Sequence, residues 1–206
     1  MHDLPCPHDL LWGMTPAQLS ADAPEWVLPV LAAGQPVVVR RAMVASGQIA
    51  VGVRGATRDQ RYATVMSADS VLRSVRPEAL VEHVPVSGLR ALLALAQLKP
   101  ALDELGMVWG VTGSVGYQLA TGVPVAHAES DLDLLVRAPQ PFSRSMAHEL
   151  LRQLDGAPCC VDLQLETPAG AIALREWAGS SDRVLLKCPT GARLVSDPWD
   201  RAEQAA

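Results

Sequence analysis

The residues best suited to chemistry lie in the stretch GSVGYQLATGVPVAHAESDLDLLV at positions 113–136. The pair Gly113 and Ser114 opens the stretch, and Asp131 and Asp133 alternate with leucines near its end. Two chemistries fit this outline. Either the glycines hold the phosphates of a dinucleotide and an aspartate holds its ribose, or the aspartates hold metal ions that act on a phosphoryl group.

The dinucleotide hypothesis fits the sequence incompletely. Asp131 and Asp133 follow Gly113 by 18 and 20 residues, close to the spacing of about 20 expected for a ribose-binding acid. The phosphate fingerprint, however, is G-x-G-x-x-G, and the glycine after Gly113 and Gly116 is Gly122. Neither of the two tyrosines is followed four positions later by lysine, as in a short-chain reductase. The sequence therefore disfavours a nicotinamide enzyme.

The metal-ion hypothesis accounts for the same residues better. A Gly-Ser turn at a helix N-terminus exposes backbone N–H groups that bind phosphate oxygens. On a strand, Asp131 and Asp133 point to one face with attachment points ~6.6 Å apart, while the intervening leucine enters the core. Asp162, in the apolar run VDLQL, adds a carboxylate from another strand. Three such oxygen ligands suit Mg²⁺ bridging a triphosphate, although D-x-D alone is also typical of a solvated edge strand.

The segments around these residues predict alternating strands and helices. They are, in order, a strand at 107–113, a short helix at 114–122, a strand at 131–138, an amphipathic helix at 142–156 and a strand at 159–167. The apolar face of the longer helix is expected to consist of Met146, Leu150, Leu151 and Leu154. This order of elements predicts a mixed α/β domain.

The first part of the chain predicts a small sheet. Residues 36–63 contain three runs rich in β-branched residues, separated by glycine or polar residues, a pattern typical of antiparallel strands. Residues 87–98, SGLRALLALAQL, predict a helix that ends before Pro100. We therefore expect a mostly β N-terminal substrate or partner module at residues 1–90 and a domain of mixed sheet and helices at residues 91–206.

Four basic residues are candidates for phosphate binding. Arg54, Arg58 and Arg61 lie within eight residues around a glycine turn, where forked contacts would hold phosphates, though a solvated basic loop has the same pattern. Lys187, one of two lysines, lies in the apolar run VLLKC, where it either reaches a phosphate or snorkels to the surface. Any polyanion must be bound locally, because the formal net charge of −5 disfavours a general nucleic-acid binder.

The composition predicts a cytoplasmic globular protein. With 49% hydrophobic and 19% charged residues, the chain can bury a substantial core. The N-terminus has no basic segment followed by an apolar one, and no run of about 18 apolar residues occurs, so no membrane partner is expected.

The cysteines at 6, 159, 160 and 188 lack C-x-x-C spacing and are expected to be buried thiols. The five histidines show no ligand spacing, which favours surface or capping roles.

The motif order resembles known transferases. Gly-Ser, short helix, D-x-D strand, helix and third-strand aspartate together resemble the DNA polymerase β-type nucleotidyltransferases over residues 107–165. The whole chain resembles the family of phosphoribosyl-dephospho-CoA transferases of malonate decarboxylase, also called malonate decarboxylase holo-acyl-carrier-protein synthases. That resemblance rests on PHDLLW at 7–12, VGVRGATRDQRYA at 51–63, GSVGYQLATG at 113–122, SDLDLLVR at 130–137 and LLKCPTGARLVSDPW at 185–199.

The second resemblance implies a specific reaction. The phosphoribosyl-dephospho-CoA group would move from 2'-(5''-triphosphoribosyl)-3'-dephospho-CoA to a serine of the apo acyl carrier subunit of malonate decarboxylase, and pyrophosphate would be released. Asp131 and Asp133 would hold a Mg²⁺ ion that activates the serine oxygen, and a second Mg²⁺ would neutralise the pyrophosphate. Asp162 would complete the first metal's shell or accept the serine proton. Gly113 and Ser114 would hold the leaving phosphates.

Two other functions stay open at this point. One is a nucleotidyltransferase that moves a nucleoside monophosphate to a small molecule or another protein. The other is a catalytically silent domain of the same fold that serves as a binding or assembly module.

Overall fold

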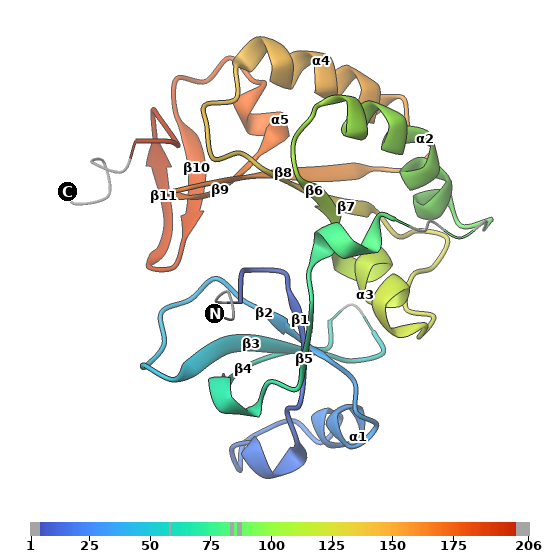
Figure 1. Cartoon of the computed structure of the whole chain (residues 1–206), viewed down its shortest axis with the longest axis vertical. Helices are drawn as coiled ribbons and strands as arrows, with labels where there is room; N and C mark the ends of the chain where they lie inside the picture. Colours follow the sequence, from blue (N-terminus) through green and yellow to red (C-terminus); the bar gives the residue numbers. More distant parts are fainter. Residues whose placement is uncertain (1–4, 58, 83–84, 86–87, 201–206) are drawn as a thin grey trace.

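Two β-sheets with separate hydrophobic cores organise the chain (Figure 1). The computed structural model describes residues 5–57, 59–82, 85 and 88–200. Within these residues, the N-terminal sheet has five strands and the C-terminal sheet has six, and helices pack on both. The expected fold class, α and β elements with a β-rich N-terminal part, is confirmed.

The N-terminal sheet is antiparallel, with the strand order β4-β3-β2-β1-β5. Its strands are β1 (Leu10–Trp12), β2 (Val37–Val39), β3 (Gln48–Arg54), β4 (Arg61–Ser67) and β5 (Arg73–Val75), and it is accompanied by η1 (Pro16–Gln18), α1 (Val27–Ala32) and η2 (Ala68–Ser70). The three predicted strands are confirmed as β2, β3 and β4. The sequence did not reveal β1 and β5, because strands of three residues are too short to show alternation.

The C-terminal sheet is mixed, with the order β11-β10-β9-β8-β7-β6. Its strands are β6 (Trp109–Val111), β7 (Leu132–Arg137), β8 (Val161–Thr167), β9 (Gly170–Ala173), β10 (Val184–Cys188) and β11 (Gly191–Val195). Only the β7–β8 pair is parallel among the pairs of this sheet in the described residues. A parallel pair needs a crossover connection, which α4 (Arg144–Asp155) supplies.

The helices of the C-terminal half lie on two sides of this sheet (Figure 1). On the outer side are α2 (Arg90–Glu104), α4 and α5 (Leu174–Trp177). On the side of the N-terminal half are α3 (Gly113–Thr121) and η3 (Pro77–Leu80). The face of the sheet that carries α3 and η3 therefore forms the junction between the halves.

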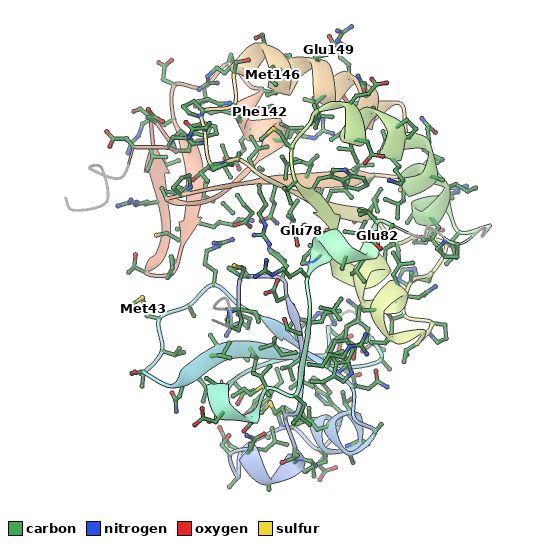
Figure 2. All side chains as sticks on the ribbon, viewed as in Figure 1. Met43, Glu78, Glu82, Phe142, Met146 and Glu149 are labelled. Atoms are coloured by element: carbon green, nitrogen blue, oxygen red, sulfur yellow. The ribbon has the colours of Figure 1, made fainter. Side chains whose placement is uncertain are left out.

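The predicted apolar face of α4 is confirmed at Leu150, Leu151 and Leu154, which lie in or against the core, but not at Met146. Ala147, Leu150 and Leu154 are buried, whereas Met146 is 44% exposed and Figure 2 shows it on the outer surface of the helix. Ser143 begins the helix, since its hydroxyl accepts a hydrogen bond from the Met146 N–H at 3.1 Å. The small side chain of Ala147 gave no hydrophobic signal, so the larger Met146 was wrongly assigned to the core.

The end of α2 also differs from the prediction. The helix continues to Glu104, with Pro100 inside it. Proline removes one backbone hydrogen bond from a helix interior, but Leu98 and Leu102 on either side are buried in the core of the C-terminal half. Packing of this face therefore outweighs the local preference. The predicted first residue, Ser87, lies outside the described residues.

Charged side chains join the two halves. The Arg41 Nη2 atom lies 2.6 Å from Glu166 Oε1 and so links the N-terminal half to the C-terminal sheet. Within the C-terminal half, beside this junction, Arg137 Nε lies 2.6 Å from Glu78 Oε1 of η3; Figure 2 shows Glu78 between the halves. His8 Nε2 lies 3.8 Å from the same Glu166 oxygen. His8 thus takes part in the junction, in contrast to the surface or capping role predicted for the histidines.

Two further expectations concern solvent exposure and the membrane. The predicted burial of the thiols is wrong: Cys160 is exposed, and Cys6, Cys159 and Cys188 are partly exposed. The adjacent pair Cys159 and Cys160 lies before β8 rather than inside it, so the apolar run begins only at Val161.

Across the described part of the chain, no helix has the length and apolar character needed to span a membrane.

Candidate active site

The three predicted aspartates line one cavity of about 470 Å³, here called the acidic cavity. The parallel register of β7 and β8 places Asp133 directly beside Asp162, and Asp131 comes immediately before β7. Leu132 and Leu134 are 0% and 1% exposed, so the predicted alternation of core and site residues is confirmed. The fold thus brings together carboxylates that are about thirty residues apart in sequence.

Gly113 is required by the position of Asp133. Its φ of +63° lies in the left-handed region, and a Cβ atom at this position would overlap the Asp133 carboxylate. The Thr112 N–H donates to the Asp133 carbonyl at 2.9 Å, which fixes the turn against β7. Ser114, in the first turn of α3, also lines the acidic cavity. The predicted Gly-Ser turn and the acidic strand therefore face each other.

The donor set of the acidic cavity suits a hard divalent cation. It consists of carboxylate oxygens, the ligands that Mg²⁺ prefers, and the absence of a side chain at Gly113 leaves room at Asp133. Glu129 adds a fourth acidic residue to the lining. Among the residues that the structure describes, however, no three His, Cys, Asp or Glu side chains are gathered closely enough to hold a metal ion. The metal site stays a prediction.

Two of the predicted arginines reach the acidic cavity. The β3–β4 register pairs Arg54 with Arg61, and both line this cavity. Arg61 Nη1 donates to the carbonyl oxygens of Thr57 and Gln60 at 3.2 and 3.0 Å, so part of its guanidinium orders the turn. The third predicted arginine, Arg58, lies outside the described residues.

Arg54 is the stronger candidate for a phosphate ligand. Its guanidinium carbon lies 5.8 Å from the centroid of the Tyr117 ring, and its buried Nε has no hydrogen-bond partner among the described residues. Burial, followed by the neighbouring charge of Arg61, lowers the pKa of Arg54, while Tyr117 and Asp133 oppose the shift. A buried donor without a partner is costly, and a phosphate oxygen would satisfy it.

A second cavity of about 530 Å³, the central cavity, adjoins the first. It shares Arg54 and Gly113 with the acidic cavity, and its lining is largely apolar, with Tyr62 and Tyr117 as its aromatic residues. Burial raises the pKa of Tyr117 to about 12, so its hydroxyl stays protonated. Sequence reasoning missed both tyrosines, although Tyr117 lies one helical turn after Gly113 and a helical projection would have placed it on the same face.

Lys187 lies outside the acidic cavity. It is exposed on β10, as part of the strand-like run predicted there. It lines a third cavity of about 470 Å³ together with Arg40 and Arg41, here called the basic cavity. It also lines a smaller cavity of about 170 Å³ with Asp133 and Asp162. The structure therefore places Lys187 near the acids but does not bring it together with the predicted arginines.

The chain matches two family models over nearly its whole length. Residues 6–77 match the Phosphoribosyl-dephospho-CoA transferase MdcG N-terminal domain, and residues 79–198 match the corresponding C-terminal domain. The models therefore divide the chain between residues 77 and 79, earlier than the boundary we predicted at 90. The division falls within η3, whose packing against β6 associates it with the C-terminal half.

The chain is also similar to curated proteins over their full length. It is 61% identical to a phosphoribosyl-dephospho-CoA transferase of Pseudomonas putida (strain W619), over 98% of both chains. It is 56% identical to that of Pseudomonas fluorescens (strain Pf0-1), over 100% of both, and 57% identical to that of Azotobacter vinelandii, over 97% of this chain and 98% of the relative. No solved structure matches the chain, so the polymerase β-type fold stays a prediction. Sequence similarity over both halves establishes that the chain is a transferase that belongs to the phosphoribosyl-dephospho-CoA transferase family.

Proposed function

We propose that this protein transfers the phosphoribosyl-dephospho-CoA group from 2'-(5''-triphosphoribosyl)-3'-dephospho-CoA to a serine of the apo acyl carrier subunit of malonate decarboxylase. The observation that carries the proposal is the acidic cavity of this family member. Asp131, Asp133 and Asp162 line that cavity together with Arg54. Such a site can hold a polyphosphate through a cation and an arginine at once. A silent binding module would not need this combination.

The reaction is a phosphoryl transfer with a defined exchange of bonds. The serine oxygen attacks the α-phosphorus, the new phosphodiester bond forms, and the bond from the α-phosphorus to the bridging oxygen breaks, so that pyrophosphate leaves. Asp162 is exposed at the edge of the cavity, where an incoming serine has access to it. It accepts the serine proton or serves as a cation ligand, the two roles open to it.

The other residues bind and orient the donor. Arg54 and the N-terminal turn of α3, with Gly113 and Ser114, hold the phosphates that leave. Asp131 and Asp133 would hold Mg²⁺, which when bound supplies positive charge to the phosphate oxygens and favours ionisation of the attacking hydroxyl. Positioning and charge neutralisation supply most of the catalysis in reactions of this class.

The test is a transfer assay read by mass spectrometry. The protein is incubated with Mg²⁺, the apo carrier subunit and the triphosphoribosyl donor, and the carrier is weighed before and after. We expect the carrier to gain the mass of one phosphoribosyl-dephospho-CoA group, and chelation of the metal to prevent the gain. No gain with any divalent metal would contradict the proposal. An equal gain with ATP as donor would instead favour a general nucleotidyltransferase.

A further inference from the structure

The acidic, central and basic cavities adjoin one another in that order at the junction of the two halves. The central cavity shares Arg54 and Gly113 with the acidic cavity, and it shares His8 and Arg40 with the basic cavity. An elongated ligand can therefore extend from the carboxylates of the C-terminal sheet to Lys187 on β10. Its middle part would lie in the central cavity.

The central cavity suits a nucleoside better than a phosphate. Its volume of about 530 Å³ is ordinary for a small-molecule site. Apolar side chains such as Leu10 and Val111 line it, and Tyr62 offers aromatic surface to a planar base. Tyr117 is 4% exposed and has Arg54 over its ring. The arginines of its lining lie at the borders that this cavity shares with its two neighbours: Arg54 and Arg61 at the acidic cavity and Arg40 at the basic cavity.

The basic cavity carries positive charge that no acidic side chain among the described residues neutralises. Arg40 and Lys187 are both exposed, and within the described ranges neither side chain makes an ion pair or a hydrogen bond. Arg41 in the same lining differs, because Glu166 accepts hydrogen bonds from its Nη2 at 2.6 and 2.7 Å. Two unpaired cations at the end of an apolar cavity are suited to a second phosphate group.

We propose that the basic cavity binds the 5'-diphosphate of the donor's dephospho-CoA part, with the adenosine in the central cavity and the triphosphate in the acidic cavity. This inference rests on the proposed function. The donor carries one polyphosphate through the 2' oxygen of its adenosine and another on the 5' oxygen, so two polar ends flank one nucleoside. The three cavities have the same order of polar, apolar and polar surfaces.

Arg40 then becomes a residue that determines specificity. ATP carries one polyphosphate and would leave either the acidic or the basic cavity without a phosphate. The full donor gains contacts at both ends. Discrimination against ATP would thus come from a site on the N-terminal sheet, far along the chain from the acidic strand.

The test is calorimetric binding of three ligands in the absence of the carrier. They are the full donor, an analogue that ends at the adenosine 5' hydroxyl and so lacks the diphosphate arm, and dephospho-CoA, which lacks the triphosphoribosyl arm. We expect Arg40→Ala to weaken the full donor and dephospho-CoA about tenfold each, the loss of a charged hydrogen bond. The analogue without the diphosphate arm should bind Arg40→Ala as tightly as it binds the wild type.

Two further variants sharpen this test. Arg152→Ala removes the same charge from the exposed face of α4, outside the linings of the three cavities, and all three ligands should bind it normally. Lys187→Ala should behave like Arg40→Ala. Because Lys187 also lies in the smaller cavity with Asp133 and Asp162, weaker binding of the analogue by this variant would place Lys187 on the triphosphate and overturn its assignment to the diphosphate.

The remaining outcomes are equally decisive. Unchanged affinity of Arg40→Ala for dephospho-CoA, or an equal loss for the analogue, would overturn the inference. So would a higher KM for the apo carrier with unchanged donor affinity, since the basic cavity would then dock the carrier. Binding does not depend on turnover. If dephospho-CoA bound through Arg40 while the transfer assay gave no product, the proposed function alone would be wrong.

Discussion

Asp133 is the residue on which the proposed chemistry depends most. It lies between two features that position it, the parallel neighbour Asp162 and the turn at Gly113. The sequence predicted its role from D-x-D alternation, and the structure adds the reason why α3 begins with glycine.

Asp133→Asn should reduce the rate of transfer by at least about 100-fold, because a neutral amide cannot supply the charge that holds a cation and its phosphates. The side chain is partly exposed, so the thermal unfolding midpoint should change little. The measurements are the mass-spectrometric transfer assay and thermal unfolding. Asp22→Asn, at a fully exposed carboxylate, is the matched control. Full activity of Asp133→Asn would remove the assignment of this residue.

Gly113→Ala should lower kcat about 100-fold, because the added methyl group displaces the Asp133 carboxylate. Gly122→Ala is a close control. Its φ of +74° imposes similar backbone strain, about 1–2 kcal/mol, but the new Cβ would meet nothing within 4 Å. We expect Gly122→Ala to lose stability and keep its kcat. Equal kcat values for the two variants would show that backbone strain, not the position of Asp133, determines the effect.

Helices and strands were predicted well where the hydrophobic pattern was long, and poorly where tertiary packing set the strand pairing or the end of a helix. The residues of β7 and β8 alternate strongly enough to be recognised, yet nothing local to either strand shows that they pair in parallel with Asp133 beside Asp162. In α4 only Met146 was wrongly included in the apolar face, because the buried Ala147 carries little hydrophobic signal. In α2 the presence of Pro100 wrongly indicated an end, because burial of Leu102 sustains the helix.

Pro100→Ala should therefore raise the free energy of unfolding by about 1–2 kcal/mol. The substitution restores a backbone N–H within α2, which is worth more than the entropy that proline removes from the unfolded chain. Pro124→Ala, in the exposed loop before β7, should have the opposite sign, a loss of about 0.4–1 kcal/mol. Urea denaturation measures both. A loss of stability in Pro100→Ala would mean that the proline ring itself packs favourably.

The whole molecule is joined at a charged junction, where Glu166 of the C-terminal sheet meets Arg41 and His8 of the N-terminal half. Burial lowers the pKa of His8; Arg41, Arg137 and Lys187 lower it further, and Glu166 opposes them. The folded protein thus holds His8 neutral at a pH where the unfolded chain, with an ordinary pKa near 6.5, begins to bind a proton.

The stability of the protein should accordingly fall as the pH drops below about 6.5. Above that pH His8 is neutral in both states and does not change the free energy of unfolding. Below it the unfolded state binds the proton first, so the free energy of unfolding falls until the pH reaches the lower pKa of His8 in the folded state. His8→Asn should reduce this dependence, and asparagine tolerates the positive φ of 76° at this position. Urea denaturation between pH 8 and pH 5 measures it. His148→Asn, on the exposed side of α4, should keep the wild-type profile; an identical profile for His8→Asn would contradict the assignment.

Patterns among neighbouring residues were enough to predict several features. These are the Gly-Ser turn that opens α3, the alternating acidic strand, the antiparallel strands β2, β3 and β4, and the blocks that place the chain in its family. Features that depend on contacts between distant segments emerge only from the folded chain. The fold set Asp162 beside Asp133, paired Arg54 with Arg61 next to them, and formed the central and basic cavities from both halves. The parallel pairing of β7 with β8 and the contacts between the halves join segments that are far apart in sequence, so no pattern within one segment encodes them.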